Sequence, residues 1–505
     1  MVKQRRVLHF LLAVGAGLCL FGAFAPVDFW PAAFLGIALL VMSLSGRTWF
    51  GSFGLGVVAG CAFFIPLFEW AAVASGVLIA QIALGFAEAL FIGVLAVIWQ
   101  GLMRGKHTGA NVALTAATMG LTWVAMEQLR SELPWHGMPW GLLGFSQVDG
   151  PLVRLAPWGS TQLVGFGVVV VGVLVARFLS ALARVQLGQG VIAGASAGLI
   201  LVLSMFLPLS TSADSYLTVG FVQGIIPDES KLPAGQSRAL TVTQNLVTAT
   251  KAIDGDDVDL VLWPESASDR DPREDDEARS LITEASERLG VPLLLGTQRY
   301  INGYRYNDYV VWNLDQSISG VYSKQHPVPF GEYMPYRDFF RKFTPAVDLI
   351  STDMLAGSKP AYLDVELKDS TVRVATPICF EVADNAIVSE AVRAGAQLIV
   401  VPTNNASFGK TSESAQQFQM TRFRAIEHGR TAIQVSTVGV SGVVEPNGVT
   451  RAVTQPWTED AQVARVGLRS ELTVATRISE PLRIAVYAGG AALGLLAFIQ
   501  LARRR

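Results

Sequence analysis

A cysteine that closes an apolar, β-branched run is the residue of this chain best placed for nucleophilic chemistry. The run Val374-Ala-Thr-Pro-Ile378 leads directly into Cys379, and Glu381 follows two residues later. A strand that delivers a thiol to its carboxyl end is a common arrangement in α/β folds, where ligands gather at strand ends. Free cysteine is also among the most buried residue types, so a packing role stays open at this point.

Two other residues follow predicted strands and could serve the same reaction. Glu265 follows Leu260-Val-Leu-Trp-Pro264, and Lys324 lies just beyond Ile318-Ser-Gly-Val-Tyr322. Strand ends on one edge of a sheet can converge although they are far apart in sequence. A carboxylate can then take the thiol proton, and an ammonium can stabilise the thiolate and a later oxyanion. The set is sufficient for acyl transfer, although a surface ion pair explains Glu265 and Lys324 equally well.

The elements that must position these residues lie beyond about residue 212, where strand-like and helical patterns alternate. This alternation predicts a layered α/β domain. The predicted strands are 216–223, 259–263, 292–296, 308–313, 318–322, 371–378, 397–402 and 431–437. The predicted helices are 238–250, 273–289, 384–394 and 415–428.

The first 208 residues predict a membrane domain. Only 16% of the whole chain is charged, against about 25% in soluble domains. Seven apolar runs approach the ~20 residues that span a bilayer, and an eighth closes the chain. They are 7–25, 30–46, 50–67, 72–100, 110–128, 161–182, 188–208 and 482–501. The first could instead be a signal peptide, but six further spans follow it directly, which favours an uncleaved anchor.

The basic residues between these spans predict the orientation. With seven spans before the large domain and one after it, all of these residues fall on one side of the membrane, and the positive-inside rule makes that side cytoplasmic. They are Lys3, Arg5, Arg6, Arg47, Arg104, Lys106, Arg177, Arg184 and 503–505. We therefore expect a multi-pass protein of the cytoplasmic membrane with both termini inside. The predicted domains are 1–211 (seven spans), 212–480 (extracytoplasmic and catalytic) and 481–505 (last span and basic tail).

Composition excludes some functions and leaves two polar membrane features open. A net charge of −2 gives no basic field for nucleic acid, and the five histidines form no metal-ligand spacing. Cys19 and Cys61 lie in apolar runs and are read as packing residues. Glu88, inside the fourth span, either faces a polar cavity or is neutral. Trp135, Trp140 and Trp158 in loop 129–160 either anchor at the membrane interface or line a lipid entry.

Three motifs around the chemical residues resemble the signatures of the nitrilase (carbon–nitrogen hydrolase) superfamily. They are Leu262-Trp-Pro-Glu265-Ser, Tyr322-Ser-Lys324-Gln-His-Pro-Val-Pro-Phe-Gly-Glu332-Tyr-Met-Pro335 and Ile378-Cys379-Phe-Glu381. The long lysine motif and the membrane spans make the chain similar to the apolipoprotein N-acyltransferase family in particular. Two more matching stretches are Trp140-Gly-Leu-Leu-Gly-Phe145-Ser-Gln147 and Gln417-Phe-Gln-Met-Thr-Arg422-Phe-Arg-Ala-Ile-Glu427.

The resemblance implies a fold and a set of site residues. The fold is a polytopic helical membrane domain of about eight spans plus a nitrilase-like αββα sandwich inserted before the last span. Glu265 would be the general base, Lys324 the transition-state stabiliser and Cys379 the nucleophile, with Glu332 and Glu381 in supporting roles. We also expect substrate contacts from Trp140, Phe145, Phe339, Phe340, Asn404, Ser407 and Phe408.

The resemblance also implies a ping-pong reaction without a cofactor. Cys379 would take an acyl chain from a phospholipid as a thioester, and the α-amine of a diacylglyceryl-cysteine at a lipoprotein N-terminus would then receive it. A membrane-tethered amidase or nitrilase that uses water, and a non-catalytic scaffold that keeps the fold, are the alternatives. The intact Glu265, Lys324 and Cys379 argue against the scaffold, and the spans argue against a hydrolase of soluble amides.

Two stretches bear on which substrates reach the thiol. Segment 336–350 mixes aromatic and basic residues, as interfacial segments do, and predicts a lid over Cys379 that dips into the headgroups. A hydrophobic flap of the soluble core is the other interpretation. The family commonly reads Asn-Asp-Ala-Trp-Phe-Gly after the next strand, whereas this chain reads Asn404-Asn405-Ala-Ser407-Phe-Gly409. Serine in place of a bulky aromatic would alter substrate preference more than chemistry.

Overall fold

A computed structural model describes residues 2–105, 111–227, 232, 237–342, 347–348 and 350–503. The chain forms two compact units, one helical and one built on β-sheets. The helical unit comprises Met1–Pro208, Lys410–Gln419 and Ile478–Arg505, and the sheet unit comprises Leu209–Gly409 and Met420–Arg477. The expected basic residues Lys106, Arg504 and Arg505, and positions 343–346 and 349 of the expected lid, lie outside the described residues.

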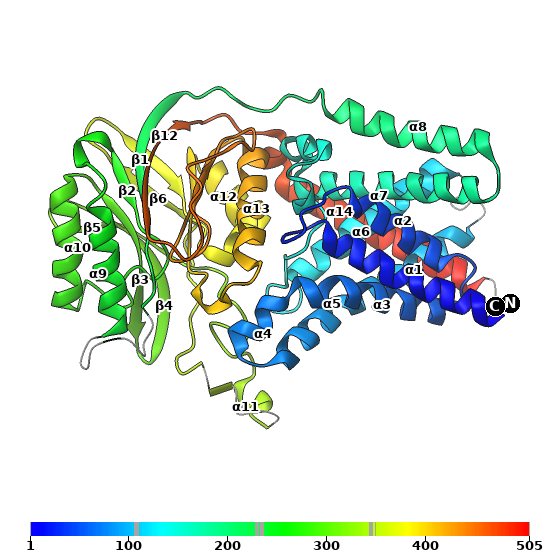
Figure 1. Cartoon of the computed structure of the whole chain (residues 1–505), viewed down its shortest axis with the longest axis horizontal. Coiled ribbons are helices and arrows are strands. Elements are labelled where there is room, and N and C mark those ends of the chain that lie inside the picture. The colour runs from blue at the N-terminus through cyan, green and yellow to red at the C-terminus, as the bar shows by residue number, and fades with distance from the viewer. Residues whose placement is uncertain are drawn as a thin grey trace. The chain divides into compact units, whose positions relative to one another are not determined.

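The helical unit is built from long apolar helices that run side by side (Figure 1). Among the described residues, six helices are long and apolar enough to cross a membrane. Their ranges are Gln4–Gly22, Trp49–Leu67, Leu78–Arg104, Pro151–Ala183, Leu187–Ser204 and Val474–Ala502. The shorter apolar helix α2 (Ala32–Leu44) and helix α6 (Val112–Glu132) occupy the other two expected spans. The structure thus has a helix in each of the eight apolar runs.

The prediction of one helix over 72–100 is wrong. The structure divides this stretch into α4 (Glu69–Ser75) and α5 (Leu78–Arg104). Gly76 ends α4 in the left-handed region with φ of 71°, the conformation in which glycine commonly closes a helix. Glu69 and Trp70 consequently belong to a separate short helix that follows α3 (Trp49–Leu67).

Small residues let α3 and α5 approach closely. Gly56 and Gly60 are four residues apart on α3, and an added Cβ at Gly56 would lie 2.6 Å from the Ile92 carbonyl oxygen of α5. The same spacing of small residues is common where membrane helices pack against each other. The glycines therefore bring the two backbones close, and the Gln81 side chain of α5 adds a hydrogen bond to the Ile65 carbonyl of α3 at 2.7 Å.

Glu88 has a partner. Its carboxylate accepts a hydrogen bond from the Arg130 guanidinium of α6 at 3.2 Å, and both side chains are buried. A buried charge is tolerated in a membrane helix when an opposite charge lies beside it. Of the two interpretations of Glu88, a neutral carboxyl and a polar cavity, neither foresaw this ion pair, because Arg130 is 42 positions away in the chain.

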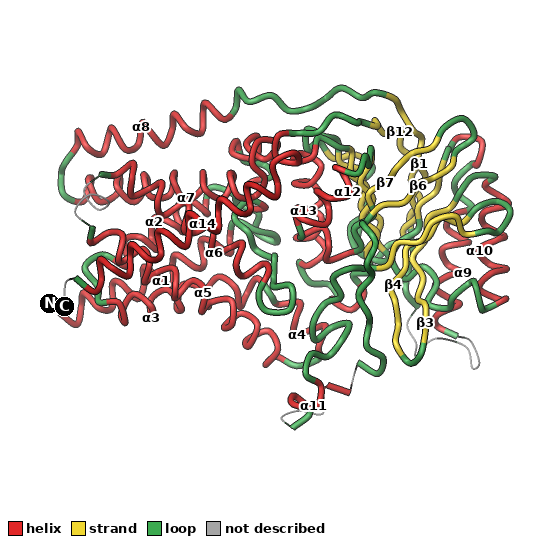
Figure 2. The backbone as a smooth tube through the Cα atoms, turned by 180° about the vertical axis from the view of Figure 1, so that it is seen from behind, coloured by secondary structure: helices red, strands yellow, loops and turns green. Residues whose placement is uncertain are grey.

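Within the described residues, the strands of the sheet unit form two sheets of six strands each. Figure 2 shows these strands in yellow. The first has the order β12-β1-β2-β3-β4-β5, and the second has the order β11-β10-β9-β8-β7-β6. The first sheet's strands are β1 (Ser215–Gln223), β2 (Leu260–Leu262), β3 (Leu293–Ile301), β4 (Tyr304–Trp312), β5 (Ile318–Ser323) and β12 (Asp460–Leu468). The second sheet's strands are β6 (Tyr362–Glu366), β7 (Thr371–Ala375), β8 (Leu398–Thr403), β9 (Thr431–Ser436), β10 (Gly442–Val444) and β11 (Thr450–Arg451).

The two sheets stack face to face over one apolar core. Buried side chains of both sheets meet there, among them Phe221 and Leu262 from the first and Val374 and Val400 from the second. Helices α9 (Arg238–Thr250) and α10 (Asp276–Leu289) cover the outer face of the first sheet and bury a second apolar cluster with it. Helices α12 (Asn385–Arg393) and α13 (Glu413–His428) lie beside the second sheet (Figure 1). The predicted αββα sandwich is confirmed.

Most predicted strands and helices are present, but several bounds differ. The hairpin β3–β4 is longer than predicted, and β6, β10, β11 and β12 were not predicted. The predicted strand 371–378 ends at Ala375, four residues before the cysteine. Pro377 follows closely and cannot donate to a strand ladder, which fits a strand that ends before it.

Candidate active site

Cys379 lies on a tight turn beyond β7 rather than on the strand itself. It begins the short 3-10 helix Cys379–Ala383 and has φ of 54°, a conformation that non-glycine residues seldom adopt. The Glu381 carboxylate accepts the Ile378 N–H at 2.7 Å, and the Glu381 N–H donates to the Ile378 carbonyl at 3.1 Å. These reciprocal bonds hold the turn closed around the thiol.

Glu381 also ties this turn to the segment that carries the lysine. Its carboxylate accepts the Tyr322 hydroxyl at 2.9 Å and the backbone N–H groups of Gln325 and His326 at 2.7 and 3.1 Å. Burial raises the pKa of this carboxyl, although the Lys324 charge and these hydrogen bonds oppose the rise. Glu381 therefore links the turn after β7 of the second sheet to Tyr322 of β5 in the first sheet. Its carboxylate is occupied by these bonds and is not placed to act as the base for the thiol.

Glu265 stands three residues beyond β2, held at both oxygens. Oε1 accepts the Asn307 side-chain amide at 2.6 Å, and Oε2 accepts the Asn404 backbone N–H at 2.7 Å. The carboxyl is also hydrogen-bonded to Cys379. Burial raises its pKa, the Lys324 charge lowers it and the Glu332 charge raises it further, for a net increase. A fixed carboxyl with a raised pKa beside a thiol has the properties of a general base.

Lys324 directly follows β5 and is 1% exposed. Its Nζ lies 2.7 Å from Oε1 of Glu332 and 3.7 Å from Oε1 of Glu265. The other oxygen of Glu332 accepts the Val328 N–H at 2.7 Å, which fixes that carboxylate. Burial disfavours the ammonium, but the charges of Glu332, Glu265 and Cys379 outweigh it and raise the lysine pKa. The neighbouring charges therefore favour the protonated form of Lys324.

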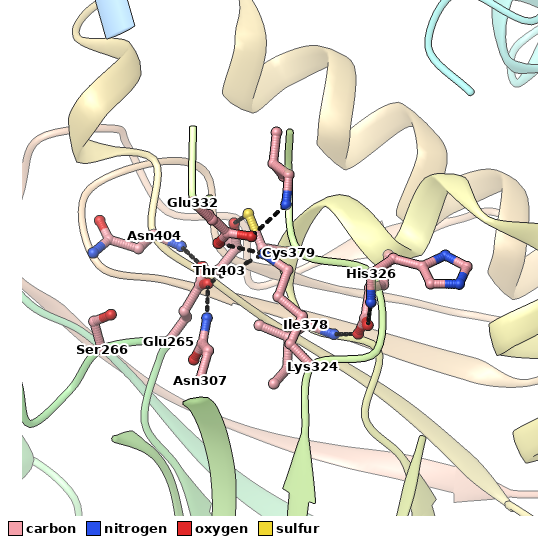
Figure 3. Close-up of polar contacts among 12 residues, drawn as sticks. Glu265, Ser266, Asn307, Lys324, His326, Glu332, Ile378, Cys379, Thr403 and Asn404 are labelled. Atoms are coloured by element: carbon pink, nitrogen blue, oxygen red, sulfur yellow. Dashed lines mark hydrogen bonds and ion pairs between the residues drawn. The ribbon is translucent and has the colours of Figure 1, made fainter. Parts of the chain in front are cut away.

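Figure 3 shows Glu265, Lys324, Glu332 and Cys379 pointing toward one another, while His326 points away. Sγ of Cys379 also accepts a hydrogen bond from the Thr403 hydroxyl at 3.2 Å. Glu265 and Lys324 follow strands of the first sheet, whereas Cys379 and Thr403 follow or end strands of the second. The expectation of one shared sheet edge is therefore wrong: the groups meet between two stacked sheets.

The other expected substrate residues of the sheet unit lie in different surroundings. Asn404 reaches the site through its backbone N–H, as described above. Ser407 is exposed and Phe408 is half-buried in the turn Ala406–Phe408. Phe339 is 54% exposed on α11 (Arg337–Phe340), and its ring packs edge-on against Phe340 at 5.2 Å. Their contact with substrate stays a prediction.

The two expected substrate residues of the helical unit are buried. Phe145 is fully buried, and Trp140 is 1% exposed with its indole N–H donating to Gln416 at 2.7 Å. Neither interpretation of Trp140, interfacial anchor or lipid lining, matches this packing. Trp158 is 42% exposed and remains compatible with an interfacial position.

Sequence reasoning missed Asn307 and Thr403. Asn307 lies mid-strand in β4, where nothing in the local pattern marks it, and it contacts both Glu265 and the backbone of Lys324. Thr403 is the last residue of β8, so the rule that ligands gather at strand ends could have found it. Within the described ranges, no group of three or more His, Cys, Asp or Glu side chains is arranged to hold a metal ion.

Comparison with known proteins yields matches along nearly the whole chain. Residues 16–174 match the family model of the apolipoprotein N-acyltransferase N-terminal domain, and residues 219–476 match that of carbon-nitrogen hydrolase. An apolipoprotein N-acyltransferase of Mycolicibacterium smegmatis is 31% identical, covering 96% of this chain and 84% of that protein. One of Pseudomonas aeruginosa is 32% identical over 87% and 86%. A solved amidase from Nesterenkonia sp. aligns with TM-score 0.39 and 17% identity, over 55% of this chain and 99% of its own.

Proposed function

This chain belongs to the apolipoprotein N-acyltransferase family, and on that premise we propose that Cys379 carries an acyl chain from a phospholipid to the α-amine of a lipoprotein. The observation that supports these residue roles is the buried convergence of Glu265, Lys324 and Cys379. A base, a cation and a thiol within contact are what acyl transfer through a thioester requires.

The first half-reaction forms the thioester. Glu265 takes the proton from Sγ of Cys379, and the thiolate attacks the ester carbonyl carbon of the phospholipid. The carbonyl oxygen becomes an oxyanion, which the Lys324 ammonium stabilises because its charge is fixed and shielded from water. The carbon–oxygen bond to the glycerol then breaks, Glu265 returns its proton to that oxygen, and lysophospholipid leaves.

The second half-reaction uses the same groups in the same order. The free α-amine of a diacylglyceryl-cysteine attacks the thioester carbonyl, and Glu265 accepts the proton that the amine loses. Lys324 again stabilises the oxyanion. The carbon–sulfur bond breaks, and the leaving thiolate recovers the proton from Glu265. A raised pKa suits this carboxyl because it must accept and release a proton within one cycle.

A membrane location suits a substrate of this kind. Burial is worth about 0.8 kcal/mol per methylene, so a chain of roughly 16 carbons would cost on the order of 12 kcal/mol in water. We propose a catalytic domain at 212–480 outside the cytoplasm, a first domain at 1–211 and a last span with its tail at 481–505. The basic residues that precede and separate the spans support this orientation through the positive-inside rule.

Mass spectrometry of the purified full-length protein, followed by digestion to peptides, tests the mechanism. Incubation with a defined phospholipid should add one acyl mass to the peptide containing Cys379, and a diacylated lipopeptide with a free N-terminus should then remove it and gain that mass. A Cys379→Ala variant should do neither. If the Cys379→Ala protein still acylates the lipopeptide, the mechanism is wrong.

The same experiment separates the proposal from a membrane-tethered hydrolase. A hydrolase would release free fatty acid from the thioester without acylating the lipopeptide. Comparison of the two products with and without the lipopeptide gives the partition between amine and water directly. Dominant fatty acid release in the presence of lipopeptide would favour the hydrolase.

A further inference from the structure

Thr403 places a hydroxyl against the sulfur of the nucleophile. It is the last residue of β8 (Leu398–Thr403), and its Oγ1 donates to Sγ of Cys379 at 3.2 Å. Thr403 is fully buried, and Cys379 is 7% exposed. The hydroxyl therefore meets the sulfur where water does not compete for the hydrogen bond.

The backbone around Thr403 holds this hydroxyl in place. Thr403 pairs with Ser436 of the neighbouring strand β9 (Thr431–Ser436), and its carbonyl accepts the Thr437 N–H at 3.1 Å. The next residue, Asn404, donates its N–H to Glu265. The end of β8 thus presents one donor to the thiol and one to its base.

We propose that Thr403 is a further catalytic residue, whose hydroxyl stabilises the Cys379 thiolate each time it forms. This inference rests on the proposed function, in which the thiolate appears as nucleophile and again as leaving group. When the S–H bond breaks, the proton passes to Glu265 and the electron pair stays on sulfur. The Thr403 O–H remains intact and now donates to an anion, a bond roughly twice as strong as one to a neutral acceptor.

The charged groups around the thiol have roles different from that of Thr403. Glu265 receives its proton, and Lys324 lies between Glu265 and Glu332 and stabilises oxyanions. Glu381, on the same turn as the cysteine, accepts hydrogen bonds from the Tyr322 hydroxyl and from backbone N–H groups. Thr403 adds a neutral donor, whose hydroxyl keeps its proton when the thiol ionises. The effect of Thr403 can therefore be separated from the effects of Glu265, Lys324 and Glu381. The measured quantity is the pH at which Cys379 becomes reactive.

The test is the rate of Cys379 alkylation by iodoacetamide as a function of pH, read by mass spectrometry of the peptide that contains it. Thr403→Val keeps the shape and removes the hydroxyl. We expect the midpoint of its rate profile to rise by about one pH unit, since a hydrogen bond to a charged group is worth roughly tenfold. We also expect the high-pH plateau to rise about threefold, because a less stabilised thiolate is more nucleophilic.

Two matched variants separate this role from packing. Thr403→Ser keeps the hydroxyl and should keep the wild-type midpoint. Thr431→Val removes a buried hydroxyl from the opposite end of the same sheet, where it donates to the Gly467 carbonyl at 2.8 Å, and should also keep it. An unchanged midpoint in Thr403→Val, or an equal shift in Thr403→Ser, would overturn the proposal.

The alkylation assay also keeps this inference apart from the proposed function. It requires neither phospholipid nor lipopeptide, so a shifted midpoint supports the thiolate contact even if no acyl adduct ever forms. Conversely, a normal acyl adduct with an unshifted midpoint in Thr403→Val would retain the acyltransferase reaction and reject Thr403 as its participant.

Discussion

Each compact unit contains a buried cation between two glutamates, and the two cations make different further contacts. In the helical unit, Arg130 pairs with Glu88 at 3.2 Å and lies one helical turn from Glu127. In the sheet unit, Lys324 lies between Glu265 and Glu332. The charge pattern is the same, so the identity of the cation and its remaining contacts must explain the difference in role.

The arginine bonds the backbone through one nitrogen of its guanidinium, the same Nη1 that bonds Glu88. Its Nη1 donates to the carbonyls of Met138 and Trp140 at 2.8 and 2.9 Å, and its plane lies over the Phe64 ring at 5.0 Å. Glu127 in turn accepts the Leu143 N–H at 2.8 Å. This cluster therefore fastens loop 138–143 to the helices, a structural task that suits a planar, always-charged group.

The lysine is a compact point charge beside a thiol. The two carboxylates fix its ammonium, which in the proposed mechanism stabilises the developing oxyanion near Cys379. A guanidinium could satisfy the same two carboxylates but is larger and planar. The comparison teaches that exchange of the two cations should damage chemistry in one unit and stability in the other.

Of the two cation exchanges, Lys324→Arg should have the larger effect. The side chain is 1% exposed, so a bulkier guanidinium must displace Glu265, the thiol or the incoming carbonyl. We expect acyl-enzyme formation to slow by about 10³-fold or more, since removal of one oxyanion-stabilising donor costs about 10²–10³. Single-turnover mass spectrometry with phospholipid measures it. A rate within tenfold of the wild type would show that position and shape of the cation are unimportant.

Glu332→Gln should give a smaller loss together with a shift in pH dependence. The Glu332 charge raises the pKa of Glu265, so its removal should lower that pKa. In the proposed mechanism, activity requires the Glu265 carboxylate and should be lost as pH falls through the pKa of this group. The acid limb of the rate profile should therefore move to lower pH. At neutral pH we expect a decrease of about 10–100-fold, because the acceptor of the lysine's bond at 2.7 Å loses its negative charge.

The pH–rate profile of acyl-enzyme formation, recorded for wild type and Glu332→Gln, measures both the shift of the acid limb and the loss of rate at neutral pH. Asp384→Asn is the control variant, because it also removes the charge of a carboxylate in an ion pair. Asp384 pairs with His326 at 2.9 Å, and Figure 3 shows His326 pointing away from the thiol. An acid limb that moves to higher pH in Glu332→Gln would contradict the assigned coupling.

Arg130→Lys is the reverse exchange in the helical unit. It keeps the charge beside Glu88 but gives up the geometry of the bonds to the Met138 and Trp140 carbonyls. We expect a loss of about 2 kcal/mol in stability, from two weakened buried hydrogen bonds. The apparent unfolding temperature in detergent should fall, while the rate of Cys379 alkylation should not change. A slower alkylation at unchanged unfolding temperature would reverse the contrast between the units.

The comparison also shows what the sequence could predict. The motifs around Glu265, Lys324 and Cys379 led to three groups that the structure brings together, because each stands in a short stretch with strong local character. Their meeting between two sheets was not predictable, since strand patterns report which faces are buried but not which sheet a strand joins. Partners far apart in the chain, such as Glu88 with Arg130 and Glu265 with Asn307, were missed for the same reason.

Glu69→Gln should have the smallest effect. Glu69 Oε1 accepts the Ser412 N–H at 3.0 Å and its hydroxyl at 2.8 Å, just before α13 begins, much as Glu265 accepts the Asn404 N–H. Glutamine keeps an acceptor at either position and removes the charge. At Glu69 this should cost about 0.5–1 kcal/mol of stability, through a weaker bond near a helix N-terminus.

The same change at the other carboxylate completes the contrast. Glu265→Gln should stop acyl-enzyme formation, because an amide can hold the Asn404 N–H but cannot accept the thiol proton. Thermal unfolding and single-turnover acylation are measured on both Glu69→Gln and Glu265→Gln. Since both carboxylates hold a backbone N–H, a loss of acylation in Glu69→Gln comparable to that in Glu265→Gln would mean that backbone positioning, rather than proton transfer, explains the requirement for Glu265.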